Sequence, residues 1–141
     1  MLIKVSKLFI LVLLLVGFSA CAGIADYQIT LIRDYDVVRT SSESIFIAKR
    51  IDETSHNASS IPVSKEGTLT EDHPEYVTQV AHDYDRYILA KTDKDLYYIL
   101  DTTTEEVYGE LNLAEFTNKK KELGISESII LKDLSEYDKE K

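Results

Sequence analysis

Apolar and polar residues alternate most regularly in the second half of the chain. Runs of β-branched, aromatic and aliphatic residues with a period of two are typical of β-strands. The predicted strands here are 76–81, 86–92, 96–102 and 107–109. Their polar connections are short, so neighbouring strands must run antiparallel. We expect an antiparallel meander whose central strands are apolar on both faces.

Further strands are predicted closer to the N-terminus. They cover residues 27–33, 37–40 and 44–51. Residues 34–36 are expected to form the first turn, and the polar stretch 52–60 a flexible loop. Residues 61–63 are predicted to pair at a sheet edge, because proline lacks the N–H that a central strand needs. Residues 65–75 again have the composition of a loop.

A helix start is marked directly after the meander. Asn112 can cap the first turn, and Glu115 stands at the third helical position, as in a capping box. Leu111 and Phe116 have the spacing of a hydrophobic staple across the cap. We predict a helix over 113–123 that covers one face of the meander, while the N-terminal strands cover the other.

The C-terminal segment is ambiguous. The apolar residues of Ser128–Leu134 fit either a last edge strand or a short helix, and the charged residues 135–141 are expected to fray. The expected fold class is therefore α+β. It consists of a mainly antiparallel β meander with one C-terminal helix packed on it, in a single globular domain over residues 27–134.

The first twenty residues have the layout of a secretory signal. Lys4 and Lys7 precede an unbroken run of nine apolar residues from Leu8 to Val16. A membrane-spanning helix needs roughly 20 apolar residues, so this run is too short to be one. We interpret residues 1–20 as a cleaved signal peptide.

The end of this segment, Phe18-Ser19-Ala20-Cys21, resembles the lipobox of bacterial lipoprotein signals, with Phe18 in place of the usual Leu. The resemblance implies that the Cys21 thiol takes a diacylglyceryl group, and that residues 21–26 form a lipidated N-terminus and short tether. Two or more acyl chains give stable anchoring to the cell membrane on its extracytoplasmic face. An ordinary signal peptide with a coincidental cysteine is the alternative.

A second resemblance spans most of the chain after the signal. The strings at 86–91, 97–101 and 107–109, followed by 113–124, resemble an uncharacterised family of small bacterial lipoproteins, a domain of unknown function. The resemblance implies a lipid-anchored extracytoplasmic domain without an established activity. It transfers no catalytic residue.

Charge and cysteine content exclude several classes of function. The 141 residues include 16 Lys+Arg and 25 Asp+Glu. Removal of Lys4 and Lys7 with the signal leaves 14 basic and 25 acidic side chains, a formal charge of −11. Such acidity argues against nucleic acid and anionic headgroups as partners. A single cysteine excludes an internal disulfide and a thiolate zinc cluster.

The candidate metal ligands lack a recognisable spacing. Asp72-His73 and His82-Asp83 place imidazoles beside carboxylates, and His56 lies in a polar stretch. A metal site needs several such groups that converge. We interpret all three histidines as exposed loop and turn residues, and we predict no metal and no cofactor.

Asp83 and Asp85 flank a predicted hairpin tip beside Arg86. A pair of carboxylates can hydrolyse a glycosidic bond, but the general acid must be buried to raise its pKa. At a hairpin tip both groups are expected to stay hydrated with ordinary acidity. We therefore favour a turn with a local Asp–Arg pair, and we predict no catalytic residue.

The sequence favours a non-catalytic binding or envelope-accessory domain, tethered through lipid on Cys21, whose envelope partner it does not identify. Two alternatives remain. One is an immunity-type protein that blocks a toxin, since an acidic surface suits a basic target. The other is an envelope glycan hydrolase that acts through Asp83 or Asp85.

Overall fold

The computed structural model describes residues 26–63 and 74–137. The first sheet contains β1 (Tyr27–Thr30), β2 (Tyr35–Ser41) and β3 (Ser44–Lys49). The second contains β4 (Val77–His82), β5 (Tyr87–Thr92), β6 (Tyr97–Asp101), β7 (Val107–Leu111) and β8 (Lys132–Asp133). The helical elements are α2 (Leu113–Glu122) and the short 3-10 helix η1 (Leu134–Glu136).

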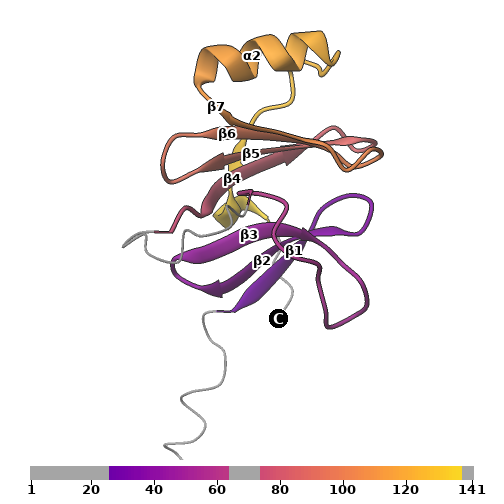
Figure 1. Cartoon of the computed structure of the whole chain (residues 1–141), viewed down its shortest axis with the longest axis vertical. Helices are drawn as coiled ribbons and strands as arrows, with labels where there is room; N and C mark the ends of the chain where they lie inside the picture. The colour runs from indigo at the N-terminus through magenta and orange to yellow at the C-terminus, as the bar shows by residue number, and fades with distance from the viewer. Residues whose placement is uncertain (1–25, 64–73, 138–141) are drawn as a thin grey trace, which may run out of the picture.

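The strands form two antiparallel sheets, in the orders β1-β2-β3 and β7-β6-β5-β4-β8. Figure 1 shows three layers, with α2 on one side of the five-stranded sheet and the three-stranded sheet on the other. Strands β4 to β7 form the predicted meander, so the α+β class with mainly antiparallel strands is confirmed.

Each face of the five-stranded sheet contributes to a separate core. The inter-sheet core faces the three-stranded sheet and includes Ile29, Tyr35, Val37, Ile47, Val80, Ile88, Tyr98 and Leu100. The helix-side core lies beneath α2 and includes Ala81, Tyr87, Leu89, Ile99, Phe116 and Ile125. This arrangement confirms the expectation that the helix and the N-terminal strands cover opposite faces of the meander.

The start of α2 follows its sequence signal closely. The Asn112 side chain accepts the backbone N–H of Glu115 at 2.9 Å, and the Glu115 carboxylate accepts the N–H of Asn112 at 2.8 Å. The helix ends at Glu122, one residue earlier than predicted, and Gly124 adopts φ +72° directly beyond it. A left-handed residue at this position is what allows the chain to turn away from the helix.

The first predicted turn was placed wrongly. Arg33 and Asp34 both adopt left-handed backbone angles, with φ of 49° and 64°, and β2 already begins at Tyr35. Asp36, which the sequence analysis assigned to the turn, lies inside β2 and is fully buried. The short polar side chain of aspartate suits a turn, but here hydrogen bonds from partly buried side chains stabilise it within the sheet.

The predicted excursion over 52–60 is not a free loop. The backbone N–H of Asn57 donates to the carbonyl of Lys49 at 2.9 Å, and that of Ser60 to the carbonyl of Ile47 at 2.8 Å. The segment therefore folds back along β3. Ile61 bridges to Ile47, in agreement with the edge pairing expected there. Most of the loop predicted over 65–75 lies outside the described residues.

The ambiguous segment after α2 is mostly irregular. Its strand β8 is only two residues long and pairs with Gln79 and Val80 of β4. Residues 135–137 were expected to fray, but Ser135 and Glu136 lie in η1, and the Tyr137 hydroxyl donates to the carbonyl of Val80 at 2.9 Å. Residues 138–141 lie outside the described range. None of the helices in the described part is long and apolar enough to span a membrane.

The burial of Phe116 predicts its contribution to stability. Its side chain is 5% exposed in the helix-side core, whereas Leu113 of the same helix is 61% exposed. Phe116→Ala is expected to lower the free energy of unfolding by about 3 kcal/mol in urea denaturation, and the matched variant Leu113→Ala by less than about 0.5 kcal/mol. Equal effects of the two substitutions would show that α2 is packed differently.

Candidate binding groove

A groove of about 460 Å³ runs between α2 and the segment 127–131 that follows it. It is lined by Gln79, Tyr97, Leu113, Phe116, Thr117, Lys120, Lys121, Glu127, Ile129, Ile130 and Leu131. Small-molecule sites have volumes of roughly 300–1,000 Å³ and are mostly apolar, with a few polar groups that orient the ligand. The size and lining of this groove fit that description.

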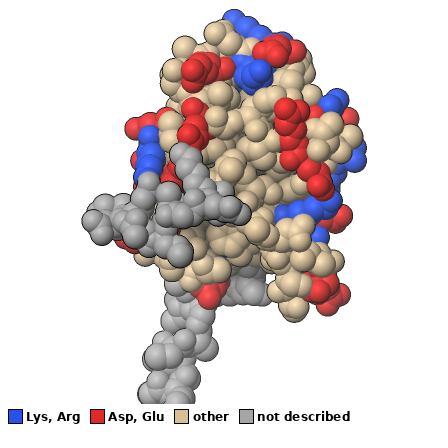
Figure 2. All heavy atoms as spheres, viewed as in Figure 1, with Lys and Arg blue, Asp and Glu red and all other residues tan. Residues whose placement is uncertain are grey.

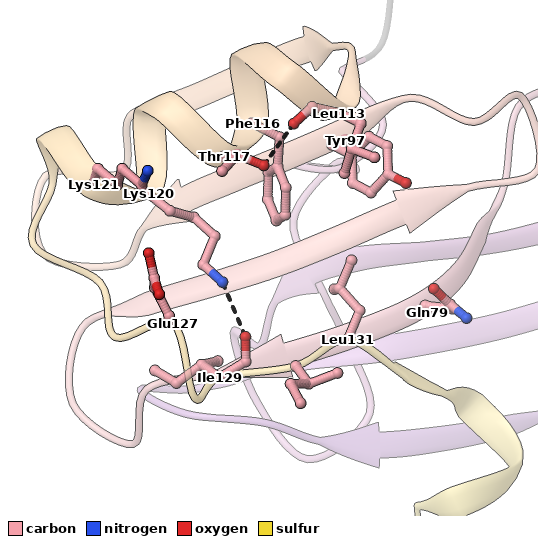
Figure 3. A pocket seen from close by; sticks show the side chains of 11 residues that line it. Gln79, Tyr97, Leu113, Phe116, Thr117, Lys120, Lys121, Glu127, Ile129 and Leu131 are labelled. Atoms are coloured by element: carbon pink, nitrogen blue, oxygen red, sulfur yellow. Dashed lines mark hydrogen bonds between the residues drawn. The ribbon is translucent and has the colours of Figure 1, made fainter.

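The middle of the groove is apolar and partly aromatic. Figure 3 shows the Phe116 ring pointing down from α2 and the Leu131 side chain pointing up toward the helix. The rings of Phe116 and Tyr97 are stacked, with centroids 4.8 Å apart. Because Phe116 also belongs to the helix-side core, its position is fixed by the packing of the whole layer.

One end of the groove is polar. The Lys120 ammonium donates to the carbonyl of Ile129 at 3.0 Å and so links α2 to the segment on the other side (Figure 3). Lys121 and Glu127 lie at the same end. Lys121 forms no ion pair with any residue in the described ranges.

Two large apolar side chains are exposed beside this groove. Leu113 is 61% exposed and Ile130 is 70% exposed. Single exposed apolar residues are common on proteins, but these two both line the groove and extend its apolar surface to the solvent. On the face drawn in Figure 2, acidic and basic side chains are interspersed and the basic ones form no continuous patch.

His56 is not the exposed loop residue that the sequence analysis predicted. Its side chain is 14% exposed, and Nε2 lies 2.7 Å from a carboxylate oxygen of Asp36. The segment 52–60 folds back along β3 and carries the imidazole to this position. This contact could not be predicted from the sequence, because the two residues are 20 positions apart and no local pattern links them.

Asp36 is the centre of a hydrogen-bonded cluster. Besides His56, its carboxylate accepts hydrogen bonds from the Arg50 guanidinium and from the Gln28 amide, the latter at 2.9 Å. Arg50 also donates to the Thr30 hydroxyl at 2.9 Å. These donors satisfy the hydrogen-bonding capacity of a carboxylate that is buried within the sheet. We assign this cluster to the cohesion of the three-stranded sheet.

Asp83 and Asp85 lie in the predicted turn between β4 and β5, but no ion pair joins either carboxylate to Arg86 among the described residues. Burial opposes ionisation of Asp83, but N–H groups of residues 85, 86 and 87 outweigh it and hold the pKa of this carboxyl below its usual value. Asp85 instead faces Arg33, in the turn between β1 and β2, at 3.6 Å. A carboxyl with a lowered pKa is a poor general acid at neutral pH.

His82 stands beside this turn. Burial lowers the pKa of its imidazole, so the ring is neutral near pH 7. Neutral Nδ1 accepts the backbone N–H of Tyr84 at 3.2 Å, and the two rings meet edge to face. The contact holds Tyr84 in a left-handed conformation with φ +71° and a side chain that is 84% exposed.

Arg86 pairs with Asp101 of β6 rather than with its sequence neighbours. Its guanidinium donates to both carboxylate oxygens, at 2.6 to 3.1 Å. The N–H groups of Thr103 and Thr104 add two further hydrogen bonds to this carboxylate. The Arg86 hydrogen bonds hold the pKa of Asp101 at about 2.

The described residues contain no group of three or more histidine, cysteine, aspartate or glutamate side chains arranged to hold a metal ion. Cys21, Asp72 and His73 lie outside the described residues. The groove was not recognised in the sequence. Its walls come from two segments whose apolar residues look like ordinary core positions, and exposure cannot be read from composition.

The fold and groove define a small α+β domain with two antiparallel sheets and an apolar hollow beneath its helix. The chain belongs to the family described as protein of unknown function DUF3997, whose model matches residues 32–135. Comparisons with curated proteins and with solved structures gave no match.

The paired Asp101 predicts a defined pH dependence. With a pKa of about 2 in the folded state and about 3.9 when unfolded, Asp101 stabilises the fold above about pH 4, and this contribution is lost as the pH falls toward 2. Asp101→Asn is expected to lower the free energy of unfolding at pH 7 by about 1.5–3 kcal/mol, and to lose less stability than wild type between pH 4 and 2.

Asp85→Asn is the matched control, because the Asp85 side chain is 88% exposed. It should change the stability at pH 7 by less than about 0.5 kcal/mol. Urea denaturation at several pH values measures both variants. Parallel pH profiles for wild type and Asp101→Asn would contradict the assigned role of the pair.

Proposed function

We propose that this protein is a lipid-anchored, extracytoplasmic, non-catalytic binding domain that presents the groove beneath α2 to its ligand. The observation that carries the proposal is the apolar groove with two exposed aliphatic side chains, Leu113 and Ile130, beside it. The lipobox-like sequence ending at Cys21 supports the anchor.

The layer order supports an outward-facing groove. Cys21 precedes Tyr27, the first residue of β1, by six positions, and six residues span at most about 22 Å. A lipid on Cys21 would therefore hold the three-stranded sheet close to the membrane. Since α2 lies on the far side of the five-stranded sheet (Figure 1), the groove would point away from the bilayer.

The state of the carboxylates favours binding over catalysis. Asp36 and Asp101 are each held by an arginine, and Asp83 is held by backbone N–H groups. None of the three projects as an unpaired acid into the groove, whose one carboxylate among the described lining residues is that of Glu127. Hydrolysis of an envelope glycan that is lost in Asp83→Asn would contradict this part of the proposal.

The anchor makes a prediction of its own. Cys21→Ser is expected to release the protein from the membrane fraction or leave an unprocessed precursor, because the thiol that takes the diacylglyceryl group is absent. Labelled palmitate should enter the wild type and not the variant. Equal labelling of the two proteins would contradict the lipid anchor.

Binding at the groove can be tested in the native envelope. A photo-crosslinking residue at position 130 is expected to give one adduct of defined mass, which Leu113→Asp in the same groove should abolish. Position 51 is the matched control, since Ile51 is an aliphatic residue 63% exposed on the segment after β3. Equal adducts at positions 51 and 130 would contradict the groove as the binding site.

A further inference from the structure

We infer that the groove beneath α2 binds a single-chain amphiphile with an anionic headgroup, taken up as a free monomer. This inference rests on the proposed binding function and names its ligand class. The tail would lie against Phe116, Leu131 and Tyr97, and the headgroup would lie at the end that carries Lys120 and Lys121.

The groove has an apolar part and a charged end, which correspond to the tail and headgroup of such a ligand. Phe116, Leu131 and Tyr97 lie in the middle and toward one end, which Gln79 borders, while both lysines and Glu127 lie at the opposite end beside Ile129 (Figure 3). A wholly apolar ligand would make no use of the charged groups of Lys121 and Glu127 at the polar end. A wholly polar ligand would leave the exposed apolar side chains of Leu113 and Ile130 in contact with water.

The charge at the polar end favours an anion. Among the described lining residues, Lys120 and Lys121 carry two positive charges and Glu127 carries one negative charge. The whole protein, in contrast, has 25 acidic and 16 basic side chains. A local excess of positive charge on an acidic domain attracts anions to this end of the groove and away from other surfaces. Lys121 contributes most directly, because it forms no ion pair within the described structure.

The walls favour an acyl tail over an added peptide strand. A strand that pairs with segment 127–131 needs free backbone groups there. The carbonyl of Ile129 already accepts the Lys120 ammonium, and its N–H donates to Ser126. An alkyl tail needs no hydrogen bonds, and the groove volume lies in the range of small-ligand sites.

The test uses the purified domain, residues 22–141, alongside the full lipidated chain in detergent-free nanodiscs, titrated calorimetrically with monomeric dodecanoate. We expect saturable binding that tightens about fourfold per methylene from octanoate to dodecanoate. Dodecyltrimethylammonium, with the same tail and opposite charge, should bind at least tenfold more weakly. Equal affinity for the two amphiphiles would overturn the inference.

Matched variants locate the site. Lys121→Gln should weaken dodecanoate binding about two- to fivefold, and Glu127→Gln should strengthen it by a similar factor. Leu113→Asp should abolish binding, and it should fold because an acidic residue at the first helical position complements the helix dipole.

Two variants outside the groove serve as controls. Lys119→Gln and Ile51→Asp should bind as wild type, because Lys119 pairs with Glu122 outside the groove and Ile51 lies beyond β3.

Two outcomes separate this inference from the proposed function. A protein adduct at position 130, with no dodecanoate binding, would overturn the amphiphile while the binding function stands. Saturable binding of the domain to anionic vesicles, lost when Lys119, Lys120 and Lys121 are replaced by Gln, would also overturn it. That result would mean that α2 contacts a membrane surface rather than a free monomer.

Discussion

The central strands of this domain are apolar on both faces, and the rest of the fold follows from that constraint. In β5, Ile88 and Ala90 face one core while Tyr87 and Leu89 face the other. A sheet of this kind must be covered on both sides to keep its apolar residues out of water. The three-stranded sheet covers one side and α2 with its following segment covers the other. The groove exists because this second cover is incomplete.

Buried carboxylates stabilise the two sheets in similar ways. Asp36 in the first sheet and Asp101 in the second each accept hydrogen bonds from an arginine guanidinium, Arg50 and Arg86 respectively. In both cases the arginine is partly exposed while the carboxylate is buried. The arginine carries the charge of the pair toward solvent, which reduces the cost of burying the acid. The acidic composition therefore serves the interior of the domain as well as its surface.

Local signals predicted the elements well, and long-range contacts were not accessible to them. The capping box of Asn112 and the short turns of the meander depend on neighbours in sequence, so the helix and β4 to β7 were found. The burial of Asp36 and the position of His56 depend on contacts between residues 8 to 20 positions apart in the sequence, and both were missed. The groove was missed for the same reason, because its walls meet only in the folded chain.

The last segment of the chain closes both cores. Ile125 belongs to the helix-side core and Leu134 to the inter-sheet core, and the Tyr137 hydroxyl is bonded to β4. A polypeptide is made from its N-terminus, and residues become available for folding in that order. Neither core of this domain can be completed until about the last dozen described residues have emerged. Completion of either core therefore waits for this segment, and a chain truncated before Ile125 would leave apolar surface open in both layers.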